Sequence, residues 1–524
     1  MSASAESPLK IQIFRALWIA TVISNIGTWM QDVGAGWQMT SLSPSPLMVA
    51  LVQTATTLPM FVLSLPAGAL ADIVDRRRLL IATQVWMMAG AATLSIATFA
   101  GLTSPTLLLV LVCSIATGMA LSAPAFQAML PEIVPVSQLP KAVALVSLGV
   151  NISRAIGPAV GGLLIALAGG PAVVFGLNAL SSIGILVVLY RWKRETRQVD
   201  LPAERFLGAL QAGLRYTLGA PAMLAVLVRC TGFFLFASAL WALLPVIGRH
   251  DLALSPTGYG GLMAFLGMGA VGGALLLRLL SERISSNRLS VLASLLFAVA
   301  TALLGLVHSF VSAAAVVLMA GAAWIAIMSA LSGAAQMAAP AWVKARTLAI
   351  YILVSQGAMT TGATFWGWLA AQAGVTAALL SAGIALVMAQ LLTSRFPVDL
   401  SVKLDLAPGD RWPAPQVDGE VQNDRGPVMI TIEYRIKPNE GAAFADAMEA
   451  MRRSRRRDGA ISWCLFEDAA MPNVFIETFV VESWLQHLRQ HERVTRADQE
   501  HEAAAQQFHI GPELPVIRHW IAPK

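Results

Sequence analysis

Long apolar runs separated by short polar turns dominate the chain up to residue 395. A helix needs about 20 apolar residues to cross the hydrocarbon core of a bilayer, and twelve runs approach or exceed this length. We therefore predict twelve membrane-spanning helices. They are expected at residues 14–38, 47–70, 79–100, 105–129, 141–168, 171–190, 222–247, 257–280, 289–308, 311–337, 347–370 and 373–394.

The composition agrees with a protein that lives in lipid. Of the 524 residues, 56% are hydrophobic and 13% are charged, against roughly 25% charged residues in a soluble domain. The basic residues of the membrane part are spread over short loops instead of clustering with aromatic side chains on a soluble face, which argues against nucleic-acid binding. The first apolar run continues past Trp37 without a small-residue cleavage site, so we interpret it as a spanning helix and not as a signal peptide.

The basic residues also predict the orientation in the membrane. Fifteen Lys and Arg residues lie in the loops after the even-numbered helices, and only Arg249 lies in the opposite loops. Positively charged loops resist translocation and stay in the cytoplasm. Both termini are therefore expected to be cytoplasmic, and the regular alternation supports an even number of helices.

The loops and the composition divide the chain into three regions. The basic loop at 191–221 splits the twelve-helix domain, residues 1–395, into halves at about 10–192 and 216–395, and the segments QAMLP and QMAAP recur in the two halves. A proline-rich stretch, 396–427, predicts an extended linker. Residues 428–524 alternate strands and helices in the order βαββαβ, which indicates a ferredoxin-like fold. The fold class is thus an all-α polytopic membrane protein with a C-terminal α+β domain.

Two short motifs suggest how the spanning helices move. The first, at the cytoplasmic end of the second helix, contains Gly68 and Asp72, followed by Arg76, Arg77 and Arg78. Glycine permits close packing, a carboxylate suits the positive end of a facing helix, and the arginines suit the anionic inner surface, so a conformational latch is expected. Simple positive-inside anchoring is the alternative.

The second motif lies in the fifth helix and contains Gly157, Pro158, Gly161 and Gly162. The glycines at 157 and 161 give a face for close backbone approach, and the proline kinks the helix, so this segment is expected at a seam between the halves. A small-residue packing face of any polytopic protein is the alternative.

Both motifs resemble signatures of the major facilitator superfamily. The first is similar to G-x-x-x-D-R-x-G-R-R, with departures at Ile73 and Asp75 that put the usual inner salt-bridge pattern in doubt. The second is similar to the G-x-x-x-G-P-x-x-G-G signature of the exporter branches, although Ser153 replaces the first glycine. The resemblance implies the twelve-helix fold of that superfamily and export of a substrate in exchange for protons.

Further segments resemble one group within that superfamily. The segments SNIGTWMQDVGAGWQM, PAFQAMLPEIVP and QGAMTTGATFWGWLA look like the enterobactin-exporter-like transmembrane secretion effectors. The tail is similar to dimeric antibiotic-biosynthesis-monooxygenase-like domains, as is the tail of many members of this group. The resemblance implies a place in the inner membrane of a bacterium and dimerisation through the C-terminal domain.

Charged residues inside the spans are few and therefore informative, because burying a charge in lipid is costly. Asp32 is the only carboxylate within a predicted span, and Arg154 lies at a similar depth. We predict that Asp32, paired with Arg154, couples transport to protons; a permanent structural ion pair, or an Asp32 nearer the outer surface, is the alternative. Arg229 lies near the inner end of its helix and is expected to extend to the interface.

The tail offers no clear chemistry of its own. His487 and His491 have the i, i+4 spacing that can hold a metal, but the sequence shows no third ligand at a suitable spacing, so we interpret them as a solvated helix face with no metal. No cofactor is expected, because fold-level similarity to monooxygenases does not carry activity.

The predicted function is secondary active transport, not enzymatic catalysis. The chain is expected to be a proton-coupled exporter of a small hydrophobic or amphipathic molecule, such as a siderophore or a drug-like metabolite. An importer of a small metabolite, a membrane-anchored monooxygenase-like enzyme and a non-transporting scaffold are the alternatives.

Overall fold

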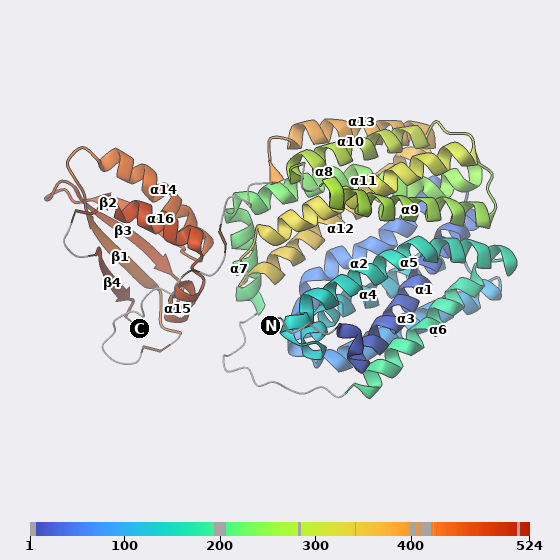
Figure 1. The fold of residues 1–524 in the computed structure, drawn as a ribbon, viewed down its shortest axis with the longest axis horizontal. Coiled ribbons are helices and arrows are strands. Elements are labelled where there is room, and N and C mark those ends of the chain that lie inside the picture. The colour runs from blue at the N-terminus through green and yellow to red at the C-terminus, as the bar shows by residue number, and fades with distance from the viewer. Residues whose placement is uncertain are drawn as a thin grey trace. The chain divides into compact units, whose positions relative to one another are not determined.

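The twelve predicted spanning helices are present in the computed structural model, which describes residues 7–192, 206–280, 284–340, 342–398, 405–406, 409, 421–422, 424–510 and 514–523. Twelve helices in this part of the chain are long and apolar enough to cross a membrane (Figure 1). They are α1 (Gln12–Leu42), α2 (Pro46–Ile73), α3 (Arg76–Phe99), α4 (Pro105–Ile133), α5 (Leu139–Leu167), α6 (Ala172–Arg191), α8 (Pro221–Val246), α9 (Pro256–Leu280), α10 (Ser286–Leu304), α11 (Phe310–Met337), α12 (Lys344–Ala373) and α13 (Val375–Thr393).

Local sequence signals explain several of the helix boundaries. Asp75, Ser104 and Ser285 accept hydrogen bonds from the backbone N–H groups three residues further on, and so cap the starts of α3, α4 and α10. Prolines occupy the first turn of α2 and α4, where the missing N–H costs nothing. Because such signals are local, the predicted and observed spans agree to within a few residues.

The spanning helices form two halves, α1–α6 and α8–α13. Within the first half, α1 packs on α5 and α6, and α2 packs on α4; between the halves, α5 runs along α9 (Figure 1). Four aromatic side chains, Phe233, Phe234, Phe297 and Trp324, pack together in the second half, with ring centroids 5.3–5.8 Å apart. We call the side on which α1 ends and α2 begins the distal side, and the opposite side the proximal side.

The chain groups into two compact units. One contains Met1–Pro202, Leu227–Leu331 and Tyr351–Phe396, and the other contains Ala203–Val226, Ser332–Ile350 and Pro397–Lys524. The second unit includes α7 (Phe206–Gly219), a helix in the stretch that the sequence predicts as a loop. Residues 193–205 of that loop, and most of the predicted linker, lie outside the described residues. The domain boundaries given above stay a prediction.

The C-terminal domain has the predicted βαββαβ order. Its elements are β1 (Val428–Arg435), α14 (Gly441–Arg457), β2 (Ser462–Glu467), β3 (Val474–Val481), α15 (Trp484–Glu492), α16 (Arg496–Gln506) and β4 (Val516–Ile521). The strands pair antiparallel in the order β2-β3-β1-β4, so β1 lies between β3 and β4. This is the split βαβ arrangement of a ferredoxin-like sheet, as expected.

One face of this sheet forms the core of the domain. Alternate residues of β1, from Val428 to Tyr434, are buried against Phe444 and Met448 of α14. Residues on the opposite face, including Met429 and Trp520, are exposed. The period of two in burial is what a half-buried strand requires.

Candidate functional site

Asp32 lines a cavity of mixed apolar and polar side chains within the first half of the membrane part. The cavity has an empty volume of about 470 Å³ and is bordered by α1, α2, α3, α4 and α6. Beside Asp32, buried Gln31 accepts a 2.7 Å hydrogen bond from Asn178 of α6. At about 1.5 Å per residue, Asp32 lies roughly 15 Å from the distal end of α1. The carboxylate thus lies inside a spanning helix, and the cavity contains these polar side chains: Ser24, Thr28, Gln31, Thr56, Gln84, Asn178 and Ser182.

The structure does not bring Arg154 to Asp32. The Arg154 guanidinium lies over the ring of Trp29, 5.3 Å from its centroid, and no ion pair joins it to Asp32. The expected pairing is therefore wrong in this conformation. The reason is helix rotation, because residues at similar depth on two helices meet only when both side chains point into the same interface.

The glycine motif of α5 faces two different helices. A Cβ at Gly157 would lie 2.5 Å from Cβ of Trp29, and one at Gly161 would lie 3.0 Å from Cα of Met30, so both positions contact α1 of the same half. A Cβ at Gly162 would instead lie 2.7 Å from Cα of Gly260 in α9. The expectation of a seam between halves is therefore correct for Gly162, whereas Gly157 and Gly161 pack within the first half.

The seam continues along α5 and α9. A Cβ at Gly260 would lie 2.7 Å from Cα of Gly162 and 2.9 Å from the carbonyl oxygen of Pro158, and one at Gly267 would lie 2.8 Å from Cα of Ala155. Backbone approach this close is possible only because glycine has no side chain. The two halves thus meet backbone to backbone along this line.

Other contacts between the halves lie between the middle of the helices and their distal ends. Thr54 and Thr57 of α2 form hydrogen bonds of 3.0 and 2.7 Å with Thr364 and Thr360 of α12, respectively. At the distal end, Arg249 stacks 4.8 Å above the Trp37 ring and donates a hydrogen bond to Ser41. In this conformation the halves are joined on the distal side.

The loop between α2 and α3 is fixed to its own half. Arg76 forms a 2.6 Å ion pair with Glu132 of α4, and Arg77 donates hydrogen bonds of 2.7 and 2.6 Å to the carbonyls of Leu189 and Tyr190, at the end of α6. Arg78 donates its backbone N–H to Asp75. The contacts of Arg77 bring positive charge to the carbonyl end of α6.

Two expectations for this loop have different outcomes. A Cβ at Gly68 would meet no atom of the described residues within 4 Å, so the expected close helix contact is not found among them. The side chain of Asp72 lies outside the described part of the structure, and its latch role stays a prediction.

A second, apolar pocket lies toward the proximal side. Its empty volume is about 360 Å³, and α1, α4 and α5 contribute aromatic and aliphatic side chains, among them Phe14, Trp18, Phe126 and Met129. Trp18 is oriented by a 2.8 Å hydrogen bond from its Nε1 to the carbonyl of Leu145. Such a pocket suits an apolar or amphipathic ligand.

Comparison with known proteins identifies the family. A family model described as transmembrane secretion effector matches residues 3–524. The chain belongs to this family of major facilitator superfamily transporters. It is similar to the enterobactin exporter EntS of Escherichia coli O1:K1, with 28% identity over 320 residues that span 61% of this chain and 75% of that protein. The EntS of Shigella boydii serotype 18 is 29% identical over the same shares of the two chains.

Solved structures show the same membrane fold. A bacterial homologue of the human lysosomal transporter Spinster, inward-facing and unoccupied, matches with a TM-score of 0.59 at 15% identity over 76% of this chain and 98% of that one. A POT family transporter in complex with a thioalcohol-conjugated peptide matches with a TM-score of 0.59 at 13% identity over 72% and 94%. The protein is thus a multi-pass membrane transporter, and its family is one of transporters and not of enzymes.

Some residues of this transporter were missed or misread in the sequence. Arg229 is buried and donates hydrogen bonds to Asn287 and Ser290 near the start of α10, contacts that the sequence did not indicate, and its expected extension to the interface stays a prediction. Arg249 stood out only as the lone basic residue of its loops, and its contact with the first half required the folded structure. Gln31 and Asn178 are polar residues in apolar runs, which was the available signal for their buried pair.

Proposed function

We propose that this transporter exports a small apolar or amphipathic molecule from a bacterial cell in exchange for protons. The observation that carries alternating access is the glycine seam, where Gly162 of one half meets Gly260 of the other backbone to backbone. The outward direction rests on the relatives named as enterobactin exporters and on the exporter-type motif of α5. An exporter of this kind belongs in the inner membrane, with both termini in the cytoplasm as the basic loops predict.

The contacts of the structure correspond to one of the two states that such a carrier needs. The seam, the threonine pairs and Arg249 all join the halves toward the distal side, and the apolar pocket lies toward the proximal side. We assign this arrangement to the state that takes substrate from the cytoplasm. In the opposite state the halves separate at these contacts and release substrate outside.

Asp32 is the proposed carrier of the coupling proton. Its cavity contains amide and hydroxyl groups that can solvate either form of the carboxyl group, and its depth in the membrane suits a site that meets the two sides in turn. Because Arg154 lies over Trp29, proton release need not break an ion pair with that arginine. Arg154 then serves to hold α5 against α1.

The proposal is tested by transport measurements on Asp32→Asn in right-side-out and inverted membrane vesicles with an imposed pH gradient. Enterobactin and a fluorescent amphipathic dye serve as probes, and efflux is normalised to inserted protein. The amide keeps the shape of the carboxyl group but has no titratable proton, so gradient-driven transport should fall to background while probe binding persists. Asp251→Asn, which changes a carboxylate near the distal ends of the helices, is the matched control and should pump like the parent.

Two outcomes contradict the proposal. If Asp32→Asn pumps at the parent rate with unchanged pH dependence, the proton passes elsewhere. If Asp32→Asn loses abundance and Arg154→Gln restores both abundance and transport, the two residues form a structural ion pair and not a coupling site. Uptake instead of efflux by the parent protein would favour the importer alternative.

A further inference from the structure

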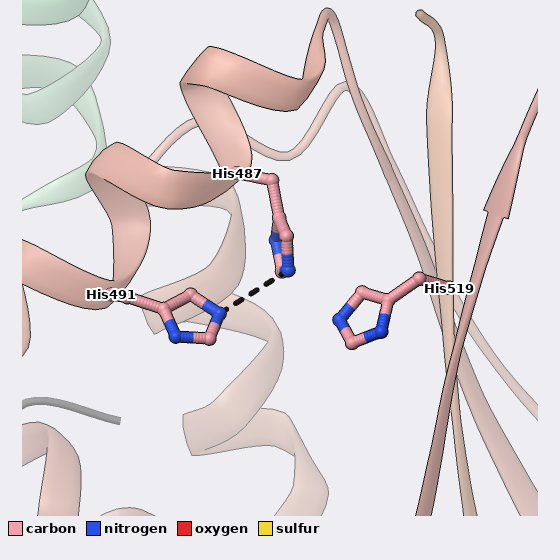
Figure 2. A group of neighbouring side chains, drawn as sticks. All are labelled: His487, His491 and His519. Carbon is pink, nitrogen blue, oxygen red and sulfur yellow. Dashed lines mark hydrogen bonds between the residues drawn. The ribbon is translucent and has the colours of Figure 1, made fainter. Parts of the chain in front are cut away.

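Three histidines converge in the C-terminal domain. His487 and His491 lie one turn apart on α15, and His519 comes from β4, which lies well beyond α15 in the sequence. Their potential ligand nitrogens all lie within 4.8 Å of one another, and the Nε2 atoms of His487 and His491 are 3.2 Å apart. Figure 2 shows the three rings turned toward a common space between the helix and the sheet.

The spacing of one pair of these nitrogens matches a tetrahedral metal site, and the third lies within 4.8 Å of both. With metal–nitrogen bonds of about 2.0–2.1 Å, two imidazole ligands of a tetrahedral ion lie about 3.4 Å apart. The separation between His487 and His491 is close to this value, and the helical i, i+4 spacing places both rings on one face. A hydrogen bond between His487 and His491 would account for that one contact, but not for the approach of a third imidazole from a different element.

The surroundings keep the rings available as ligands. The buried His487 ring packs against the other two imidazoles and Trp484. Neutral imidazoles are the form that binds metal ions. Arg455, a nearby cation, is itself ion-paired with buried Glu477 at 3.1 Å, which compensates its charge.

We propose that His487, His491 and His519 bind one divalent transition-metal ion of the Zn²⁺ or Cu²⁺ class. Three imidazoles and no carboxylate or thiolate form the cluster, a donor set that suits Zn²⁺, Cu²⁺ and Ni²⁺ and disfavours Mg²⁺ and Ca²⁺. Three protein ligands leave a fourth position for water or another ligand. The earlier interpretation of His487 and His491 as a solvated face is wrong for His487, which is 2% exposed.

The bound ion would add a metal link between two elements whose side chains already pack on each other. Trp484 packs against His487 and His519, with ring centroids 5.5 and 5.9 Å away, and closes one side of the cluster. An ion held there links α15 directly to β4. Because it binds only the folded domain, its presence should raise the thermal stability of that domain.

Metal binding is measured on the full chain, purified in detergent, with its affinity tag removed because polyhistidine binds the same ions. After chelation and dialysis, Zn²⁺ alone is titrated by calorimetry, with Mg²⁺ as the comparison ion. We expect one Zn²⁺ per chain, no detectable Mg²⁺ binding, and slower hydrogen exchange in α15 and β4 when Zn²⁺ is present. Absence of Zn²⁺ binding by the folded parent protein overturns the proposal.

Single His→Gln variants at 487, 491 and 519 locate the site. Each should weaken Zn²⁺ binding at least tenfold, because loss of an outer-shell partner alone already costs about 10–100-fold. His501→Gln, a histidine of α16 outside the cluster, should bind like the parent. Circular dichroism without metal checks that each variant is folded. Parent-like affinity in all three cluster variants overturns the assignment.

X-ray absorption of the Zn²⁺-loaded parent gives a second test that needs no variant. The spectrum should show three imidazole ligands with nitrogen or oxygen in the remaining position and no sulfur. A sulfur ligand would place the ion at a cysteine such as exposed Cys464, and a shell without imidazole would place it elsewhere; either result overturns the proposal.

Discussion

An alanine at position 162 tests the seam between the halves. Its Cβ would lie 2.7 Å from Cα of Gly260 and 2.7 Å from the carbonyl oxygen of Pro256. Both neighbours are backbone atoms and cannot rotate away, so α5 and α9 must move apart. Overpacking of this kind costs about 1–3 kcal/mol.

That cost applies to the state in which the distal side is closed. If the seam opens in the alternative state, Gly162→Ala should shift the equilibrium toward distal opening by about 5–150-fold, the range that corresponds to 1–3 kcal/mol. The shift is measured with a Thr54→Cys reporter in a protein without its three native cysteines. A membrane-impermeant maleimide added from outside should modify this cysteine faster in the Gly162→Ala protein.

Two glycine variants serve as comparators. Gly272→Ala changes α9, the helix that Gly162 faces, at a position where a Cβ meets no atom of the described residues within 4 Å, so the alkylation rate should stay at the parent value. Gly157→Ala clashes with Trp29 inside the first half and should lower the amount of folded protein without raising reporter accessibility. The reasoning is refuted if folded Gly162→Ala is alkylated at the parent rate, or if Gly272→Ala gives the same increase.

Three further predictions concern topology, the C-terminal core and assembly. A single cysteine placed in the 191–221 loop should resist an impermeant reagent in intact cells, and labelling there would reverse the predicted orientation. Burial alone would raise the pKa of Asp498, but Arg457 at 2.7 Å and hydrogen bonds from Thr495 and Ser454 hold it below its usual value. Its stabilisation is therefore present above the unfolded pKa of about 3.9 and is lost as pH falls through the folded value. Asp498→Asn should cost about 1.5–3 kcal/mol at pH 7, seen as faster hydrogen exchange in α14 and α16, and the difference from the parent should shrink at lower pH. The exposed sheet face supports the prediction of dimerisation, so Trp520→Glu should convert a dimeric full chain in detergent to monomer by light scattering, and an unchanged mass would contradict it.

The sequence by itself determined the spanning helices and the order of the C-terminal elements, although it did not indicate α7. The cost of placing charged groups and unpaired backbone in lipid acts on each segment separately, so hydropathy alone predicts twelve spans. Caps such as Asp75 and Ser104 are equally local. In the tail, the alternation of apolar and polar residues predicted the strands of the βαββαβ fold, because a strand with one covered face has a period of two. The burial pattern of β1 agrees with this period.

Only the tertiary structure decided which of these residues meet. Periodicity does not fix how a helix is rotated against neighbours from distant parts of the chain, and apolar spans permit many rotations. Hence Gly162 faces α9 while Gly157 faces α1, and Arg154 turns to Trp29 instead of Asp32. For the same reason the third histidine, on β4, was invisible in the sequence, because sheet pairing and helix docking bring it to α15 and no local spacing records them.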